Sequence, residues 1–458
     1  MASTRSITPA FEGDFKGYEQ SGPAGIDEQI ACTGSGTAGG EYMRRFWHPI
    51  YVTDELGDLP KAITILGEEL VVFRYGDGSK IGLVHKYCPH RRASLEYGKC
   101  EDRGIRCCYH GWLFAPDGEI LETPGENSKT EKAAEMVRQR TRLGAYPVIE
   151  YKGLIFTYMG PPEVIPEFPY YDGMEIDDMT YRPYQIPYTC NWIQVLDAIM
   201  DPVHTTFLHS QNSHPQFSEG MSEVGELKFY ERNKNHFIGT STRRVGDNAW
   251  VRANELILPN FTQAGSAFAA DGTESRYFGR SCFVRWVVPV DDENCIAFAW
   301  ACFGERGDPH EYNNQEGCEL IEQGEILDRT DEERQRRPAD SEAVEGMGAI
   351  STHMGENLMP SDRGVSLYRR RLRKQIRNLE EGTEPPQHVR HNDFSVRTYG
   401  QDTVLNLPPI EGKDDREYLA EIGCAVMDAQ FSFEEKDNDA RDECIIAAMQ
   451  HLENNGIG

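Results

Sequence analysis

The sequence contains no long hydrophobic run. No stretch of its 458 residues approaches the roughly 18 consecutive apolar residues of a membrane-spanning helix. The first twenty residues also lack the apolar segment of a secretion signal. Together these absences predict a cytoplasmic protein with no membrane partner.

An excess of positive charge is missing as well. The chain has 47 basic and 75 acidic side chains, which gives a formal net charge of −28. Such a surface repels nucleic acids and anionic membranes, so we expect no nucleic-acid partner. The one basic run, residues 368–374, coincides with apolar residues at helical spacing. This pattern predicts a solvated or interface helix rather than a nucleic-acid patch.

Two further patterns are absent. The 12 cysteines are scattered along a long chain and do not resemble the disulfide framework of a secreted domain. No convincing G-x-G-x-x-G motif follows a predicted strand, which argues against nicotinamide binding by the chain itself. The cysteines therefore need an explanation other than disulfides.

Turn residues and hydrophobic periodicity divide the chain into four parts of an α+β protein. Residues 1–42 predict an extended N-terminal arm, and residues 43–160 predict a small antiparallel β domain. A proline-rich linker covers 161–179. Residues 180–458 predict a second domain, in which antiparallel strands are followed by helices after about residue 315, the last at roughly 433–453.

Cysteine and histidine occur together twice in the first predicted domain. Cys88 and His90 form a C-x-H couplet, and Cys107 and His110 form a C-x2-H couplet. Two thiolates and two imidazoles are the ligands of a Rieske [2Fe–2S] centre. A structural zinc site usually pairs like ligands, as C-x2-4-C and H-x3-5-H, and fits less well. Ordinary buried cysteines and histidines rarely show both spacings, so we predict an iron–sulfur cluster.

The second couplet contains an ambiguity. Cys108 and His110 also stand in C-x-H spacing, so Cys107 and Cys108 compete for one ligand position. The x2 spacing favours Cys107, with Cys108 as a loop residue.

A second group of possible ligands lies in residues 191–209. Asp197, Asp201 and His204 fall on one side of a predicted apolar helix, and His209 follows His204 by five residues. A regular helix would point these histidines about 140° apart. If both bind one metal, the segment needs a widened turn or a helix end near Pro202. The alternative is an ordinary core helix with two satisfied histidines.

Two histidines and one carboxylate on a face are the ligand set of non-haem Fe(II) oxygenases. Such a site would also give the predicted cluster a destination for its electron. Each motif therefore makes the other more credible.

With both motifs in view, nearly the whole chain resembles the catalytic α subunit of a Rieske non-haem iron oxygenase. The resemblance is to the phthalate-dioxygenase-like branch, which includes ring-hydroxylating dioxygenases and aryl O-demethylases. The segments Cys-Pro-His-Arg and Cys-Cys-Tyr-His-Gly-Trp resemble the Rieske loops of that family, and D-x3-D-x2-H-x4-H, from residue 197 to 209, matches its iron motif.

The resemblance implies a fold and a set of residue roles. The catalytic domain would be an antiparallel sheet with helices, of the helix-grip type. His204 and His209 would bind the iron, and Asp201 would hydrogen-bond a ligand histidine of each metal centre. Asp340, which opens a D-x4-E-x-M-G stretch, would be the third ligand, ahead of Asp331 and Asp362.

The resemblance also implies cofactors and partners. The terminal oxygenase would use O2 and electrons from NADH, delivered by a separate flavin-containing reductase, possibly with a ferredoxin. It would hydroxylate an aromatic substrate, expected to be carboxylated, by ring hydroxylation or O-demethylation. A homotrimer or a dimer of trimers is implied. The alternative is a Rieske-type electron-transfer protein with an appended binding domain.

Residues that contact the substrate are harder to predict. Arg243 and Arg244, between two predicted strands, are candidates for binding a carboxylate, although an exposed pair at a strand end is the simpler interpretation. Core packing is likewise the simpler interpretation for four aromatic candidates for the pocket wall: Phe207, Trp250, Phe268 and Phe278.

Overall fold

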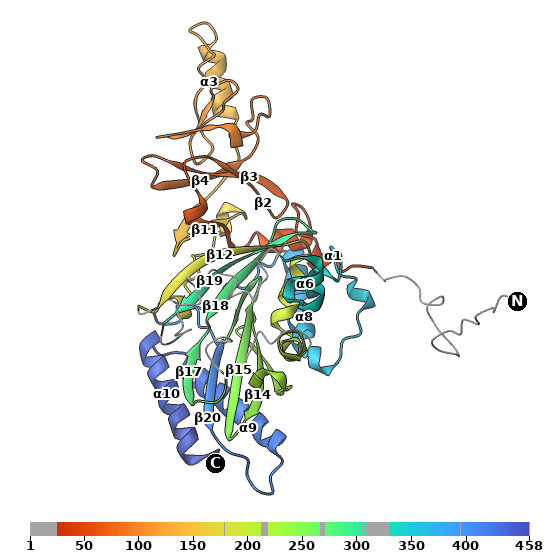
Figure 1. Cartoon of the computed structure of the whole chain (residues 1–458). Coiled ribbons are helices and arrows are strands. Elements are labelled where there is room, and N and C mark those ends of the chain that lie inside the picture. The colour runs from red at the N-terminus through yellow and green to blue at the C-terminus, as the bar shows by residue number, and fades with distance from the viewer. Residues whose placement is uncertain are drawn as a thin grey trace, which may run out of the picture.

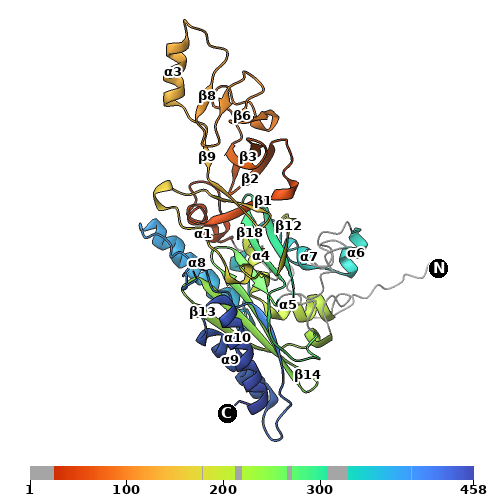
Figure 2. The ribbon, with the colours of Figure 1, turned by 90° about the vertical axis from the view of Figure 1, so that its left-hand side faces the viewer.

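A computed structural model describes residues 25–177, 179–211, 219–265, 271–304, 306, 329–393 and 395–457. Figures 1 and 2 show an elongated molecule with a small β domain at one end and two long helices near the C-terminus at the other. A large twisted sheet lies between them. The α+β class expected from the sequence is confirmed. The structure contains the predicted small antiparallel β domain and, after it, the predicted antiparallel sheet with helices.

The small β domain contains three antiparallel sheets. Its strands are β1 (Trp47–Val52), β2 (Lys61–Ile65), β3 (Glu68–Tyr75), β4 (Lys80–His85), β5 (Lys99–Glu101), β6 (Gly104–Arg106), β7 (Leu113–Phe114), β8 (Ile120–Glu122), β9 (Ala145–Tyr146), β10 (Val148–Tyr151) and β11 (Leu154–Tyr158). The sheets have the orders β1-β11-β10, β2-β3-β4-β9 and β5-β6-β7-β8. Helix α3 (Glu131–Arg140) projects from the free end of this domain (Figure 1).

The large sheet has nine antiparallel strands. They are β12 (Thr180–Tyr188), β13 (Glu226–Arg232), β14 (His236–Val245), β15 (Asn248–Ile257), β16 (Phe261–Ala264), β17 (Arg276–Arg280), β18 (Phe283–Pro289), β19 (Cys295–Phe303) and β20 (Gln401–Asn406). The main order is β12-β19-β18-β16-β15-β14-β13, and β20 pairs with both β15 and β17. Strand β15 therefore lies inside the sheet and is buried along its whole length.

Helices cover both faces of this sheet. Helices α9 (Asp415–Ser432) and α10 (Asn438–Asn455) pack on one face, where Ala249 and Val251 of β15 join their apolar cluster. Helix α4 (Trp192–Ile199) packs on the opposite face and contacts β15, β16 and β18. Because side chains alternate along a strand, Trp250, Arg252 and Asn254 point toward the α4 face.

The basic run forms part of α8 (Arg363–Glu380), as predicted, and one face of this helix packs against the rest of the chain. Val365, Tyr368, Leu372 and Ile376 are buried on one side of it. Three of its basic side chains, Arg369, Arg371 and Arg373, pair with acids, for example Arg371 with Glu231. The predicted helix is therefore confirmed, with one face packed against its own chain and the other, which includes Arg370 and Lys374, exposed.

The N-terminal arm differs from the expectation where it is described. Residues 28–31 and 38–43 form two short helices, α1 (Glu28–Ala31) and α2 (Ala38–Met43), that pack on α8. Ile30 and Tyr42 are fully buried, so this part is not an extended arm. Residues 1–24 lie outside the described residues.

The segment expected to be a linker is also packed. Phe168, Tyr171 and Met174 join the main apolar cluster, and the buried carboxylate of Asp172 accepts a hydrogen bond from Arg441 at 2.9 Å. The proline-rich composition was misleading because aromatic residues in the same segment supply the buried contacts.

The predicted start of the C-terminal helices, at about residue 315, lies outside the described residues. After β19, the first helix that the structure describes is α6 (Asp331–Arg336), and residues 307–328 lie outside the described residues. The last helix covers Asn438–Asn455 rather than 433–453, because α9 ends at Ser432. Every helix in the described part of the chain is too short or too polar to cross a membrane.

Candidate active site

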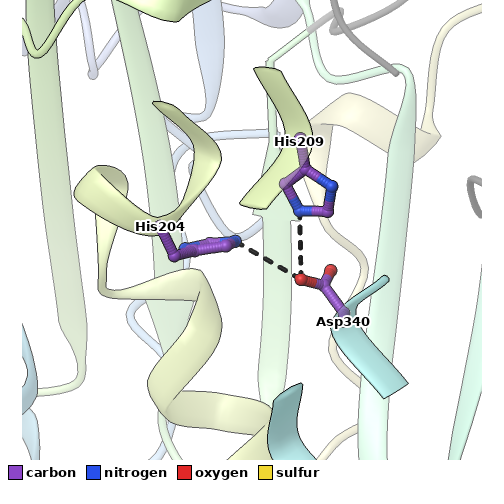
Figure 3. Close-up of side chains that lie close together, drawn as sticks. All are labelled: His204, His209 and Asp340. Carbon is purple, nitrogen blue, oxygen red and sulfur yellow. Dashed lines mark hydrogen bonds and ion pairs between the residues drawn. The ribbon is translucent and has the colours of Figure 1, made fainter. Parts of the chain in front are cut away.

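Three side chains converge between α4 and the large sheet. His204 Nε2 lies 3.5 Å and His209 Nε2 lies 3.0 Å from the same oxygen, Asp340 Oδ1. Figure 3 shows all three side chains pointing toward one point, from three different segments. One ligand atom from each residue lies within 4.8 Å of the others.

A break and a widened turn bring the two histidines together. Helix α4 ends at Ile199, and Pro202 begins the short helix α5 (Pro202–Thr206), which carries His204. His209 follows on a π-helical turn, Phe207–Gln211. A π turn adds a residue to each turn, which rotates His209 relative to a regular helix. The predicted helix end and widened turn are both confirmed.

The backbone fixes the orientation of the His204 ring. Its Nδ1 atom hydrogen-bonds the main-chain carbonyl of Asp201. A carbonyl oxygen only accepts, so Nδ1 carries the proton and the lone pair of Nε2 faces Asp340. Such a contact from the second ring nitrogen is typical of histidines that bind metals.

The carboxylate of Asp201 does not occupy the position expected within the chain. Its Oδ1 caps α5 by accepting from the backbone N–H of Val203 at 2.9 Å. The other oxygen lies 4.0 Å from His204 Nδ1, too far for a hydrogen bond. Asp201 therefore holds His204 through its carbonyl rather than its carboxylate.

Asp340 begins α7 (Asp340–Glu345), and buried hydrogen bonds attach this segment to α4. Gln194 Nε2 donates to the carbonyls of Val344 at 2.7 Å and Gly348 at 3.0 Å. Gln194 Oε1 accepts from the N–H of Ser351 at 2.9 Å. One side chain thus holds the loop after Asp340 against the helix that leads to the histidines, a role that the sequence did not suggest.

The other aspartates near the site have different roles. Asp331 starts α6, and the carboxylate of Asp362 accepts from the N–H of Met359 at 2.6 Å. Asp197 forms a buried ion pair with Arg369, so it faces α8 rather than the histidines. Of the three carboxylates considered for the third position, the structure brings Asp340 to the histidines.

The surroundings keep Asp340 ionised. Burial alone raises the pKa of this carboxyl group, but the charge and hydrogen bond of His209 oppose that effect. His204 and Arg285 act in the same direction, and the result is a pKa below the ordinary value. The carboxylate is thus available as an anionic ligand.

The three donors fit a metal ion. Bonds of about 2.0–2.2 Å to one ion place adjacent ligand atoms about 3 Å apart when the angle between them is near 90°. The separations of 3.0 and 3.5 Å from Asp340 Oδ1 agree with this arrangement. Two imidazoles and one carboxylate on one side of a cavity also leave the remaining coordination positions free for other ligands.

A small cavity of about 50 Å³ adjoins the three residues. Its apolar lining includes Val195, Ile199, Phe283 and Val287, and its polar lining includes Tyr188, Arg252, Asn254 and Arg285. These four polar residues were missed by the sequence analysis. The available signal was the presence of two polar residues, Arg252 and Asn254, at alternate positions of a strand rich in apolar residues.

The predicted substrate contacts lie elsewhere. Arg243 is buried and donates to Ser241 and to the carbonyl of Glu223, and Arg244 pairs with Asp415. Trp250 lies in another cluster, Phe278 packs near α9 and α10, and Phe207 is exposed. None of these five lines the cavity among the described residues. Phe268 lies outside the described residues.

The two cysteine–histidine couplets lie on two loops of the small β domain, one between β4 and β5 and the other between β6 and β7. The imidazole rings of His90 and His110 have centroids 4.6 Å apart, and Trp112 stacks on His90 at 4.5 Å. Cys88 and Cys107 are both buried in the same apolar cluster. Four potential ligands from two loops are thus brought to one place.

The two adjacent cysteines differ sharply in burial. Cys107 is 3% exposed, whereas Cys108 is an exposed loop residue. Burial, together with the nearby Cys107, raises the pKa of the Cys88 thiol to about 11. A thiol of this pKa stays protonated at neutral pH unless a metal replaces the proton. The geometry therefore supports Cys107 over Cys108 as the partner of Cys88.

Comparison with known proteins agrees with this architecture. The sequence profile of the Rieske [2Fe-2S] domain matches residues 46–147. The tert-butanol monooxygenase / tert-amyl alcohol desaturase oxygenase subunit of Aquincola tertiaricarbonis is 40% identical over 411 residues, with 85% of each chain covered. The phenoxybenzoate dioxygenase subunit alpha of Ectopseudomonas oleovorans is 35% identical, covering 82% of this chain and 91% of that protein.

The fold also matches a solved structure. The crystal structure of dicamba monooxygenase bound to dicamba superposes with a TM-score of 0.55 at 16% identity, covering 75% of this chain and all of that one. The chain belongs to the oxygenase subunits of the Rieske non-haem iron oxygenases. It is therefore an enzyme subunit of a multicomponent system, and the electron-carrier alternative is not favoured.

Proposed function

We propose that this oxygenase subunit binds one iron ion between His204, His209 and Asp340 and there oxygenates a small organic substrate. The observation that carries the proposal is the convergence of two imidazole nitrogens and one carboxylate oxygen beside a buried cavity. Bound iron would supply the reduction of O2, which a protein side chain alone does not perform.

We also propose that the electrons enter through a [2Fe–2S] cluster. Its proposed ligands are Cys88, His90, Cys107 and His110. The profile match over these loops and the contrast between buried Cys107 and exposed Cys108 support this assignment. For a monooxygenation, a C–H bond, O2, NADH and one proton give the C–OH product, NAD+ and water. A ring dihydroxylation places both oxygen atoms in the product.

The residues of the chain have separable tasks in this scheme. The main-chain carbonyl of Asp201 accepts a hydrogen bond from the Nδ1–H group of His204 and so fixes the ring. Gln194 fixes the loop that follows Asp340. The apolar wall that includes Ile199 and Phe283 limits the entry of water to the reacting atoms.

The family to which the chain belongs supports proposals for its electron donor and its oligomeric state. The separate reductase is proposed to contain flavin, with or without a ferredoxin. A homotrimer or a dimer of trimers would let the Rieske domain of a neighbouring subunit approach Asp201, whose side chain is 29% exposed in the single chain. A cytoplasmic location remains a prediction.

The names of the relatives offer two substrate classes. One relative is named for a tertiary alcohol and another for an aromatic acid. The carboxylated aromatic expected from the sequence is therefore one of two classes to compare.

The test is a measurement of iron content and of substrate-dependent consumption of NADH and O2 with a surrogate reductase. The panel should contain aromatic acids, aryl methyl ethers and tertiary alcohols. We expect three irons per chain, one of them removable by chelation, and formaldehyde release only if the reaction is O-demethylation. Two irons per chain with no substrate-dependent use of O2 would instead support an electron carrier.

A further inference from the structure

Two buried polar atoms in the cavity wall lack hydrogen-bond partners among the described residues. They are Arg252 Nε and Asn254 Oδ1. The two residues are only 4% and 5% exposed. Both residues line the cavity that adjoins His204, His209 and Asp340. Buried polar groups in folded proteins are nearly always paired, so we expect a bound water or a substrate group to pair these two atoms.

The rest of each side chain is firmly held. Arg252 Nη2 donates to Asp402 Oδ2 at 3.2 Å, and the same carboxylate accepts from the Trp250 indole at 2.7 Å. This pairing offsets the charge of the guanidinium and keeps it from rotating. The Nε–H group is thus a donor in a fixed position, and the charge of its guanidinium is already balanced by Asp402.

Asn254 is oriented by α4. Its Nδ2 lies 3.4 Å from the main-chain carbonyl of Ile199, which only accepts hydrogen bonds. The amide nitrogen must face that carbonyl, so the amide oxygen is the atom left without a partner. The wall of the cavity therefore offers one unused donor and one unused acceptor.

The two atoms belong to alternate residues of β15, on the same face of the sheet. Alternate Cα atoms of a strand are about 7 Å apart. A hydroxyl oxygen forms hydrogen bonds of about 2.8 Å and can donate one while it accepts another. One hydroxyl group therefore offers both the acceptor that Arg252 Nε–H lacks and the donor that Asn254 Oδ1 lacks.

We propose that Arg252 and Asn254 form a subsite for a neutral hydroxyl group of the substrate. The hydroxyl donates to Asn254 Oδ1 and accepts from Arg252 Nε–H, which holds the carbon skeleton beside His204, His209 and Asp340. The inference rests on the proposed function, because the subsite adjoins the proposed iron ligands. It assigns the substrate to the compact alcohols rather than the carboxylates.

The chemistry of the wall discriminates between these classes. An ionised carboxylate has no proton to donate and would place negative charge against Asn254 Oδ1. A hydrocarbon would leave both polar atoms unpaired. A site built to hydrogen-bond a hydroxyl rejects analogues without one far more strongly than a site of apolar walls does.

The experiment compares three matched probes: benzyl alcohol, toluene and benzoate. Binding to the iron-loaded protein is measured by anaerobic calorimetry, without reductase. For the unaltered protein we expect benzyl alcohol to bind at least about 10-fold more tightly than toluene or benzoate. Asn254→Leu, which removes the acceptor, should weaken benzyl alcohol binding by about 10- to 100-fold and leave toluene binding unchanged or tighter.

Asn248→Leu is the control. Asn248 lies on the same strand, but its Nδ2 is already paired with the carbonyls of Gly272 and Thr273, and it does not line the cavity. This substitution should keep the preference for the alcohol. If Asn254→Leu does not fold, the order of the three probes on the unaltered protein still decides the question.

Two results would overturn the subsite: tighter binding of benzoate than of benzyl alcohol, or equal weakening of all three probes by Asn254→Leu. Selective alcohol binding without any oxygenated product would count against the proposed function alone. Turnover without a preference for the alcohol would count against the subsite alone. The two proposals therefore fail in different ways.

Discussion

His209 Nε2 lies 3.0 Å from Asp340 Oδ1, although 131 positions separate the two residues in the chain. The contact joins the π-helical turn after α5 to the first residue of α7. Because His204 faces the same oxygen, Asp340 is the residue that turns two neighbouring histidines into a three-ligand site.

Removal of the carboxylate should therefore empty the mononuclear site. We expect Asp340→Asn to keep the side-chain shape but lose the negative charge, and to bind about two irons per chain instead of three. The visible absorption of the Rieske cluster should be unchanged, and substrate-dependent O2 consumption should disappear. Iron analysis of the purified variant measures the first effect.

Asp331→Asn is the matched control, because Asp331 lies in the first turn of α6 and not beside the histidines. It should retain three irons and full activity. Loss of the third iron in this control, with retention in Asp340→Asn, would refute the assignment.

The adjacent cysteines should respond in opposite ways. Cys107→Ser should abolish the visible absorption of the cluster, because Cys107 is buried next to Cys88. Cys108→Ser should retain the absorption, since Cys108 is exposed. The absorption spectra and the iron-to-chain ratios of the two variants measure this difference, and the reverse pattern would move the ligand role to Cys108.

The histidines and the cysteine couplets were predictable because their chemistry is local. Each couplet spans only a few residues. The spacing of His204 and His209 requires an irregular turn if both bind one metal, because a regular helix would point them apart. Pro202 gave the position of the break, since proline lacks the N–H that continues a helix. The structure contains this break and a π turn directly after it.

The rest of the site depends on contacts between distant segments. Asp340 could be chosen from the sequence only by resemblance, because no local spacing relates it to His209. Arg252 and Asn254 were missed since β15 is buried on both faces and shows no simple alternation. The substrate prediction placed Arg243 at the pocket, but its neighbours Ser241 and Glu223 already satisfy its guanidinium.

Gln194 should act as a positioning residue for the iron site. Its side chain makes three hydrogen bonds to residues 344–351, so Gln194→Leu should loosen the segment that carries Asp340. We expect iron affinity at this site to fall by up to about 10-fold, less than the loss of a hydrogen bond made directly to a ligand would cause. Titration of the chelated protein with Fe(II) measures the affinity, and an unchanged dissociation constant would limit Gln194 to a purely structural role.

Buried His48 should make stability depend on pH. Burial lowers the pKa of His48 from 6.5 to about 4, despite hydrogen bonds with the Met43 carbonyl and Asn260. Between these values the unfolded chain binds a proton that the folded chain does not, so the free energy of unfolding rises with pH. The contribution is complete above pH 6.5 and is lost as the pH falls toward 4.

The effect of this one residue is up to about 3 kcal/mol, since each pKa unit corresponds to about 1.4 kcal/mol. Urea unfolding of the protein between pH 4 and pH 7 measures it. His48→Gln can keep a donor and an acceptor but does not titrate, so the slope of stability against pH should be smaller in this variant over the same range. An identical slope in both proteins would show that His48 does not resist protonation in the folded state.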